Sequence, residues 1–130
     1  MRILLADDYP AVSNLVESLL ESSHEIVGKV CDGKTLVEAA VRLKPDVIVT
    51  DISMPILNGI EAGRKLKESG CCAKLIYVTI HSDSDFVDAC MHVGASGYVL
   101  KRRMDADLLL AISEVAAGRK FISQTAEGEN

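Results

Sequence analysis

The stretch VIVT at residues 47–50, followed directly by Asp51, decides the fold. All of its residues are β-branched, which is typical of a central parallel strand that is covered on both faces. Similar short runs recur along the chain and alternate with segments of helical period. These runs are RILLA at 2–6, EIVGKVC at 25–31, LIYVT at 75–79 and GYVL at 97–100.

The segments between these runs carry apolar residues at helical spacing. The first segment is the clearest, and its repeat predicts one buried stripe made of Val12, Leu15, Val16, Leu19 and Leu20. The expected helices cover 9–22, 35–43, 60–69, 86–93 and a last segment that begins at Asp105. Five strand–helix repeats with short connections predict an α/β fold: a doubly wound, five-stranded parallel sheet of order 2-1-3-4-5, the flavodoxin-like (βα)5 arrangement.

The composition is that of one ordinary globular domain. The 130 residues are 48% hydrophobic and 25% charged, and the net charge of -5 argues against a compact nucleic-acid-binding domain. No apolar run is long enough to span a membrane. The cysteines have neither a C-x-x-C pair nor zinc-ligand spacing, so we expect reduced thiols and a cytoplasmic protein without membrane contact. We expect the domain to occupy residues 1–117, and the aperiodic residues 118–130 to be a tail or the start of a linker.

Polar side chains gather where the predicted strands end. Asp7 and Asp8 follow the first strand, Asp51 follows the third, Thr79 ends the fourth and Lys101 follows the fifth. In a doubly wound sheet the carboxyl ends of the strands border one crevice, so we expect these side chains to meet there. Three carboxylates at close range repel one another, and a divalent cation with oxygen ligands would relieve that repulsion. The pattern therefore predicts a Mg²⁺ site.

The same side chains could support phosphoryl transfer to a carboxylate. Asp51 is the expected nucleophile, because its strand is central and it is within reach of both the metal and Lys101. Lys101 and the Thr79 hydroxyl would neutralise charge on the oxygens of the transferred group. Each residue alone also has an ordinary structural explanation, as a helix start, a turn, a strand residue or a solvated charge. Their joint position at the ends of successive strands favours a site.

Four motifs resemble the receiver domain of two-component response regulators. They are LLADD at 4–8, DISMPILNG at 51–59, YVT at 77–79 and GASGYVLK at 94–101. The resemblance covers the chain up to the tail and implies a signalling switch rather than a turnover enzyme. The residues that it implies are Asp51 as phosphoacceptor; Asp7, Asp8, Asp51 and the backbone carbonyl of Ser53 as Mg²⁺ ligands; Thr79 and Tyr98 as switch residues; and Lys101 as the partner of the phosphoryl group.

The GASGYVLK motif and the run AAGRKFIS at 116–123 are similar to the NarL/LuxR-type subfamily. This resemblance implies a bacterial, cytoplasmic transcription regulator that receives its phosphoryl group from a sensor histidine kinase. Phosphorylation would move Tyr98 inward and form a homodimer through the surface of the 86–93 helix, the 97–100 strand and the last helix. DNA would be bound only through a helix-turn-helix output domain, which these 130 residues do not contain, so we expect an excised receiver.

Two positions depart from the pattern of this family. Ile80 follows the switch threonine, where most members have Ala or Gly, and we expect its bulk to narrow the access of a phosphodonor or water. Arg102 follows Lys101, where most members have Pro after a cis bond. Because a cis bond before a non-proline residue costs roughly 3 kcal/mol, we expect a trans bond and a locally different loop. His81 either borders the phosphoryl site and influences water there, or is a rim residue without a titration role.

Three other functions are open at this point. A phosphorylation-independent interaction module would fit the two departures. A Mg²⁺ phosphatase of the haloacid-dehalogenase type would also use an aspartyl phosphate, but it carries its nucleophile in a D-x-D motif, where this chain has the adjacent Asp7 and Asp8. A flavodoxin-like cofactor carrier would bind phosphate in the loop after the first strand, where the same two carboxylates would repel it.

Overall fold

The computed structural model describes residues 1–124 as alternating strands and helices. Every expected strand and helix is present, with ends that differ from the expected ones by a few residues. The strands are β1 (Arg2–Ala6), β2 (Glu25–Val30), β3 (Val47–Thr50), β4 (Lys74–Thr79), β5 (Gly97–Leu100) and β6 (Phe121–Ile122). The helices are α1 (Pro10–Leu20), α2 (Gly33–Leu43), α3 (Gly59–Glu68), α4 (Ser84–His92), α5 (Met104–Ala116) and the short 3₁₀ helix η1 (Lys101–Arg103).

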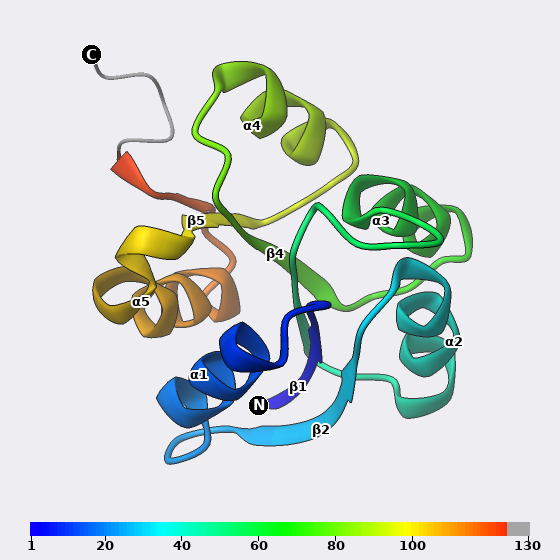
Figure 1. Cartoon of the computed structure of the whole chain (residues 1–130), viewed down its shortest axis with the longest axis horizontal. Helices are drawn as coiled ribbons and strands as arrows, with labels where there is room; N and C mark the ends of the chain where they lie inside the picture. The colour runs from blue at the N-terminus through cyan, green and yellow to red at the C-terminus, as the bar shows by residue number, and fades with distance from the viewer. Residues whose placement is uncertain (125–130) are drawn as a thin grey trace.

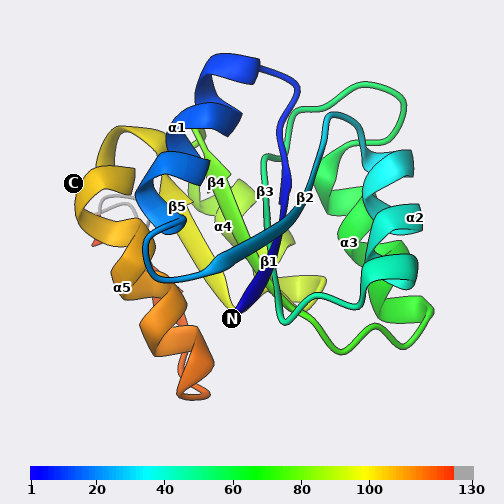
Figure 2. The ribbon, with the colours of Figure 1, turned by 90° about the horizontal axis from the view of Figure 1, so that it is seen from below.

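The strands form one parallel sheet between two layers of helices. Its order is β2-β1-β3-β4-β5-β6, and each neighbouring pair is parallel. Helices α1 and α5 cover one face, while α2, α3 and α4 cover the other (Figures 1 and 2). The doubly wound fold and the order of its first five strands are therefore confirmed.

Two apolar cores lie on the two faces of the sheet, and β3 contributes to both. Ile48 packs with side chains from α2, α3 and α4, whereas Val47 and Val49 pack with side chains from α1 and α5. All three are buried, as expected for a central strand without a solvent-facing side. Because β3 is held on both faces, the residue that follows it, Asp51, has a fixed position at the edge of the sheet.

A sixth strand is the main difference from the expected sheet. The expected aperiodic tail begins at residue 118, but Phe121 and Ile122 pair in parallel with Gly97 and Tyr98 on the open edge of β5. Two residues are too few to show a period in the sequence, so only the unpaired edge of β5 decides this strand. Residues 125–130 of the expected tail lie outside the described part of the chain.

The buried stripe expected on the first helix is correct in part. Val16 and Leu20 are buried, but Leu15 is 45% exposed, so its place in the stripe was wrong. At 100° per residue, Leu15 lies roughly 130° around α1 from the centre of the buried side formed by Ser13, Val16 and Leu20. Leu15 was included in the stripe because it lies about one helical turn from both Val12 and Leu19. These two residues are themselves only partly buried, so they lie at the margin of the buried side.

Candidate functional site

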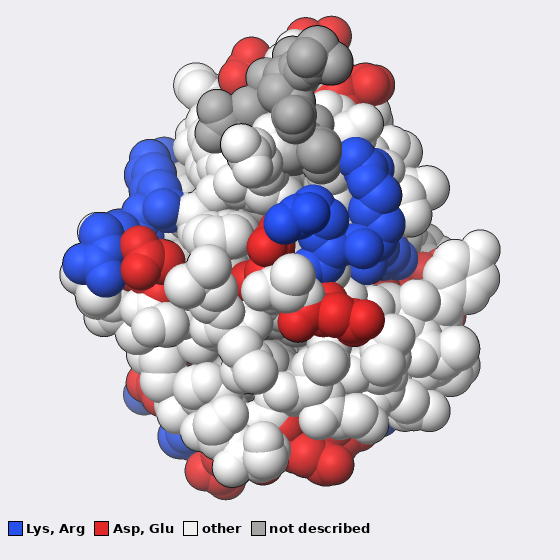
Figure 3. Space-filling view, turned by 90° about the vertical axis from the view of Figure 1, so that its left-hand side faces the viewer, with Lys and Arg blue, Asp and Glu red and all other residues white. Residues whose placement is uncertain are grey.

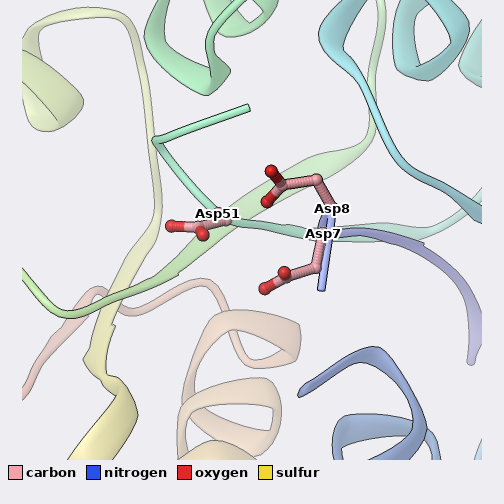
Figure 4. A group of neighbouring side chains, drawn as sticks. All are labelled: Asp7, Asp8 and Asp51. Atoms are coloured by element: carbon pink, nitrogen blue, oxygen red, sulfur yellow. The ribbon is translucent and has the colours of Figure 1, made fainter. Parts of the chain in front are cut away.

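The three predicted acidic residues meet at the carboxyl edge of the sheet. Asp7 and Asp8 follow β1 and Asp51 follows β3, and one carboxylate oxygen from each lies within 4.8 Å of the others. Figure 4 shows the three carboxylates gathered beside the ends of these strands. The expectation that they come together is therefore correct.

Asp51 is the most enclosed of the predicted site residues that carry charge. It is 5% exposed, and both of its carboxylate oxygens accept hydrogen bonds. Oδ1 accepts from the backbone N–H of Ile52 at 2.7 Å, and Oδ2 accepts from the ammonium group of Lys101 at 2.9 Å. The Lys101 Nζ atom also lies 3.3 Å from Asp7 Oδ2, so this lysine points into the crevice and bridges two of the carboxylates.

Burial and charge act in opposite directions on the groups of this site. Burial raises the pKa of Asp7, against the hydrogen bond from the Tyr9 backbone N–H and the charge of Lys101. Burial alone would lower the pKa of Lys101, but the hydrogen bond to Asp51 and the charges of Asp51 and Asp7 outweigh it and raise the pKa. Lys101 thus contacts two carboxylates at once. Because it is one cation beside three carboxylates, the cluster has an excess of negative charge.

The third carboxylate, that of Asp8, indicates that the site binds a cation. The Asp8 Oδ1 atom is buried and accepts no hydrogen bond from any group in residues 1–124. A buried anionic oxygen without a donor is costly, and two more carboxylates stand beside it. A small, hard divalent cation with oxygen ligands, such as Mg²⁺, matches this donor set. Ser53, the fourth expected ligand, is exposed, and its hydroxyl lies 3.4 Å from His81 Nε2.

Gly59, which ends the motif DISMPILNG, shapes the loop around Asp51. A Cβ atom at Gly59 would lie 2.0 Å from the backbone oxygen of Asp51, so only glycine allows the loop to approach this closely. The backbone N–H of Gly59 donates to the carbonyl of Ile52 at 2.7 Å. Asn58 caps α3 by accepting from the backbone N–H of Glu61 at 2.9 Å. The Pro, Asn and Gly of residues 54–59 predict a loop here, but the close approach of Gly59 to the Asp51 backbone is seen only in the folded structure.

The two predicted switch residues both bind the backbone of His81. Thr79 is fully buried, and its hydroxyl accepts from the His81 backbone N–H at 3.2 Å. The Tyr98 hydroxyl donates to the His81 carbonyl at 2.7 Å. The His81 ring stacks on Phe86, with 4.1 Å between ring centroids. The loop between β4 and α4 is therefore held at the backbone of His81, whereas the sequence reasoning considered only the His81 side chain.

Tyr98 already lies inside the protein. Its side chain is fully buried, and burial raises the pKa of its hydroxyl. The expected inward movement upon phosphorylation stays a prediction.

The two departures from the family pattern are visible at the rim of the crevice. Ile80 is 72% exposed beside Thr79, and its effect on access stays a prediction. The bond between Lys101 and Arg102 is trans, as expected, and the residues after β5 form the turn η1. This turn begins at Lys101 itself, so the lysine side chain and the start of α5 share one short segment of backbone.

Comparisons with known proteins agree with this geometry. The family model described as the response regulator receiver domain matches residues 3–113. The chain is 38% identical to the transcriptional regulatory protein DegU of Brevibacillus brevis, over 94% of this chain and 52% of DegU. It is 34% identical to the nitrate/nitrite response regulator NarL of Escherichia coli K12, over 94% of this chain and 57% of NarL. It therefore spans just over half the length of these relatives.

Solved structures show the same similarity in three dimensions. A two-component response regulator of the LuxR family from Aurantimonas sp. SI85-9A1 superposes with a TM-score of 0.93 at 32% identity, covering 98% of this chain and 93% of the other. The isolated REC domain of RcsB from Salmonella enterica serovar Typhimurium, in the presence of the phosphomimetic BeF3⁻, superposes with a TM-score of 0.90 at 26% identity, covering 98% and 96%. No helix within residues 1–124 is long and apolar enough to cross a membrane.

Proposed function

This chain belongs to the family of response regulator receiver domains, of the NarL/LuxR type, and on that premise we propose that Asp51 accepts a phosphoryl group from a sensor histidine kinase. The observation that carries the proposal is the bond between Lys101 and Asp51 beside two further carboxylates. Lys101 is a cation held 2.9 Å from the proposed nucleophile, where the oxygens of an incoming phosphoryl group would need one.

The transfer itself is a displacement at phosphorus. A carboxylate oxygen of Asp51 attacks the phosphorus of a phosphohistidine, the P–N bond breaks, and the imidazole nitrogen keeps the electron pair. Lys101 exchanges one of its carboxylate contacts for a phosphoryl oxygen. The backbone N–H of Ile52 holds the other Asp51 oxygen and so orients the carboxylate. Asp51 performs one transfer and is not regenerated by the same reaction, as suits a switch rather than a turnover enzyme.

Asp7, Asp8, Asp51 and the backbone carbonyl of Ser53 are the residues that would hold Mg²⁺. The buried Asp8 oxygen without a hydrogen-bond donor supports this assignment, because a cation would satisfy it. When bound, the ion supplies positive charge that offsets the developing charge on the phosphoryl oxygens. Asp7 is kept in place by the backbone N–H of Tyr9, which donates to its Oδ1 at 2.9 Å.

Thr79 and Tyr98 are the proposed switch residues, and their shared contact is His81. A phosphoryl group on Asp51 offers the Thr79 hydroxyl a strongly charged acceptor. If the hydroxyl turns toward it, the His81 backbone N–H loses its present acceptor. The hydrogen bond from the Tyr98 hydroxyl to the His81 carbonyl would then determine the new position of the loop between β4 and α4. The phosphoryl group thus biases the loop before α4 between two arrangements.

The output is proposed to be a homodimer that positions two DNA-binding domains in a cytoplasmic transcription regulator. The proposed receiver covers residues 1–117, with β6 packed on it, and a following linker and helix-turn-helix domain would fit a chain that spans just over half of its relatives. In the surface expected for the dimer, the edge of β5 is occupied by β6, so the contact would use helix surfaces. Figure 3 shows broad uncharged areas on the side where α1 and α5 lie. Exposed Leu109 and Leu110 belong to α5, which is part of the expected dimer surface, whereas exposed Leu15 belongs to α1, which is not.

Phosphorylation by a small phosphodonor tests the proposal. Incubation of the protein with phosphoramidate and Mg²⁺ should add one phosphoryl group, read by intact-protein mass spectrometry, and Asp51→Asn should abolish the addition. Asp88→Asn is the matched control, because Asp88 is an exposed aspartate on α4. Equal labelling of the Asp51→Asn variant would show that another residue is the acceptor.

A phosphorylation-independent interaction module is the second candidate. Two features favour it: Ile80 is 72% exposed beside Thr79, and Arg102 follows Lys101 through a trans bond, where most members of the family have Pro. The two candidates differ in solution behaviour. Under the first, light scattering should detect more dimer after addition of Mg²⁺ and beryllofluoride; under the second, the wild type and Asp51→Asn should associate equally in all conditions.

A further inference from the structure

The chain after α5 returns to the sheet and is fastened there. We call residues Phe121–Ser123 the strap: Phe121 and Ile122 form β6 along the edge of β5, and Ser123 follows. The β6 arrow lies beside β5 and leads to the end of the chain (Figure 1). The family model ends at residue 113, so the strap lies outside the part of the chain that defines the family.

Ser123 is the anchor of the strap. The residue is fully buried, although the next residue, Gln124, is exposed and is the last one that the structure describes. Its backbone N–H donates to the carbonyl of Tyr98 at 2.8 Å. Its hydroxyl accepts from the backbone N–H of Leu100 at 3.1 Å and donates to Asp107 Oδ2 at 2.7 Å. Every polar atom named here is therefore used to attach the strap to β5 and α5.

Asp107 joins the strap to the turn that carries the site lysine. It is a buried acidic residue in the first turn of α5. Its carboxylate accepts from the Ser123 hydroxyl and also from the Arg103 guanidinium, with Arg103 Nε 2.9 Å from Oδ2. A buried carboxylate with two donors forms charge-assisted hydrogen bonds, which are stronger than neutral ones. Arg103 ends η1, and Lys101 begins it.

The strap therefore holds Lys101 from both sides along the chain. Ser123 fixes the backbone of Leu100, directly before Lys101, and Asp107 fixes the side chain of Arg103, two residues after it. Lys101 itself reaches Asp51 across 50 residues of sequence. The backbone that positions the site cation is thus held by residues from the segment that leaves the domain.

We infer that Ser123 and Asp107 are positioning residues for Lys101, and that the strap and the phosphoryl group on Asp51 stabilise each other. This inference rests on the proposed function, since it concerns the same lysine. The docked strap keeps Lys101 ready at Asp51, and a phosphoryl group that binds Lys101 tightens the turn to which the strap is attached. Binding linkage is reciprocal, so the effect must appear in both directions. Phosphorylation would then fix the direction in which the chain leaves the domain.

Binding of a phosphoryl mimic separates this role from ordinary stabilisation. In Ser123→Ala, the affinity for beryllofluoride at saturating Mg²⁺ should fall by roughly two-fold to thirty-fold, the range that couplings of this kind span. The affinity for Mg²⁺ alone should change less than the affinity for beryllofluoride, because Lys101 contacts two of the proposed Mg²⁺ ligands but is not one of them. Ser113→Ala, at an exposed serine on the same helix as Asp107, is the matched control and should leave both affinities unchanged. Asp107→Asn keeps an acceptor for the Ser123 hydroxyl but removes the charge that binds Arg103, so it should also lower the affinity for beryllofluoride.

Amide hydrogen exchange measures the reverse direction. Beryllofluoride with Mg²⁺ should slow exchange at the backbone N–H groups of Leu100 and Ser123 in the wild type, and Ser123→Ala should remove this protection at Leu100. Equal beryllofluoride affinity in Ser123→Ala and Ser113→Ala would overturn the coupling while leaving the function of Asp51 intact. A wild type that binds Mg²⁺ but never beryllofluoride would overturn the proposed function, and the inference with it.

Discussion

Asp8→Asn should make the metal-free protein more stable, because it removes the least compensated charge of the site. The Asp8 Oδ1 atom is buried without a donor in the described chain, and the Asp7 and Asp51 carboxylates stand beside it. An asparagine at this position keeps the shape, loses the charge and brings N–H donors that the neighbouring carboxylates can accept. Lys101 is bonded to the other two carboxylates, so the variant leaves its contacts with Asp7 and Asp51 in place.

The size of the effect follows from the separation of the charges. At the 4.8 Å limit that encloses the three ligand atoms, one pair of like charges repels by about 3.5 kcal/mol at an effective dielectric constant of 20, and by about 0.9 kcal/mol in bulk water. Asp8 faces two carboxylates and one lysine, which leaves the repulsion of about one charge. The free energy of unfolding should therefore rise by roughly 1–3 kcal/mol.

Urea unfolding in EDTA and in excess Mg²⁺ provides the assay. With an m-value of about 2 kcal/mol/M, the midpoint of Asp8→Asn should exceed that of the wild type by roughly 0.5–1.5 M in EDTA. In excess Mg²⁺ the order should reverse, because the wild type gains more stability from a cation that binds only the native state. Asp88→Asn, at an exposed aspartate, should shift neither midpoint. If Asp8→Asn is less stable than the wild type in EDTA, the carboxylates do not repel one another as argued.

Three further changes test other parts of the structure. Gly59→Ala should slow phosphorylation and lower stability, because its Cβ would lie 2.0 Å from the Asp51 backbone oxygen and the loop must move; unchanged labelling kinetics would refute this. Tyr77→Phe should cost about 1–3 kcal/mol in urea unfolding, because the buried Tyr77 hydroxyl donates to the Gly59 carbonyl at 2.6 Å and that carbonyl would lose its donor. The pKa of His24 is lowered by burial and by the charge of the Met1 amino group, so the protonated ring opposes folding. The unfolding free energy should therefore fall as the pH drops below about 6.5, and His24→Gln should flatten this slope between pH 5 and 7; equal slopes for both proteins would contradict it.

The site was predictable to the extent that it depends on strand ends. Parallel strands present their carboxyl ends at one edge, so the position of Asp7, Asp8 and Asp51 after β1 and β3 was enough to bring them together. Lys101 was predictable for the same reason, and its bond to Asp51 agrees with that reasoning. The shared contact of Thr79 and Tyr98 was not predictable, because it depends on where the His81 backbone lies in a loop without periodicity.

The amino-acid sequence by itself determined the alternation of strands and helices. Apolar spacing and turn residues are local properties, so each segment contains the information that specifies its own secondary structure. Tertiary structure alone decided the exposure of Leu15, the pairing of β6 with the edge of β5 and the contact of Ser123 with Asp107. Each of these depends on which side chains and edges remain unpaired after the sheet and its helices have packed. That is a property of the assembled fold, and no short stretch of sequence contains it.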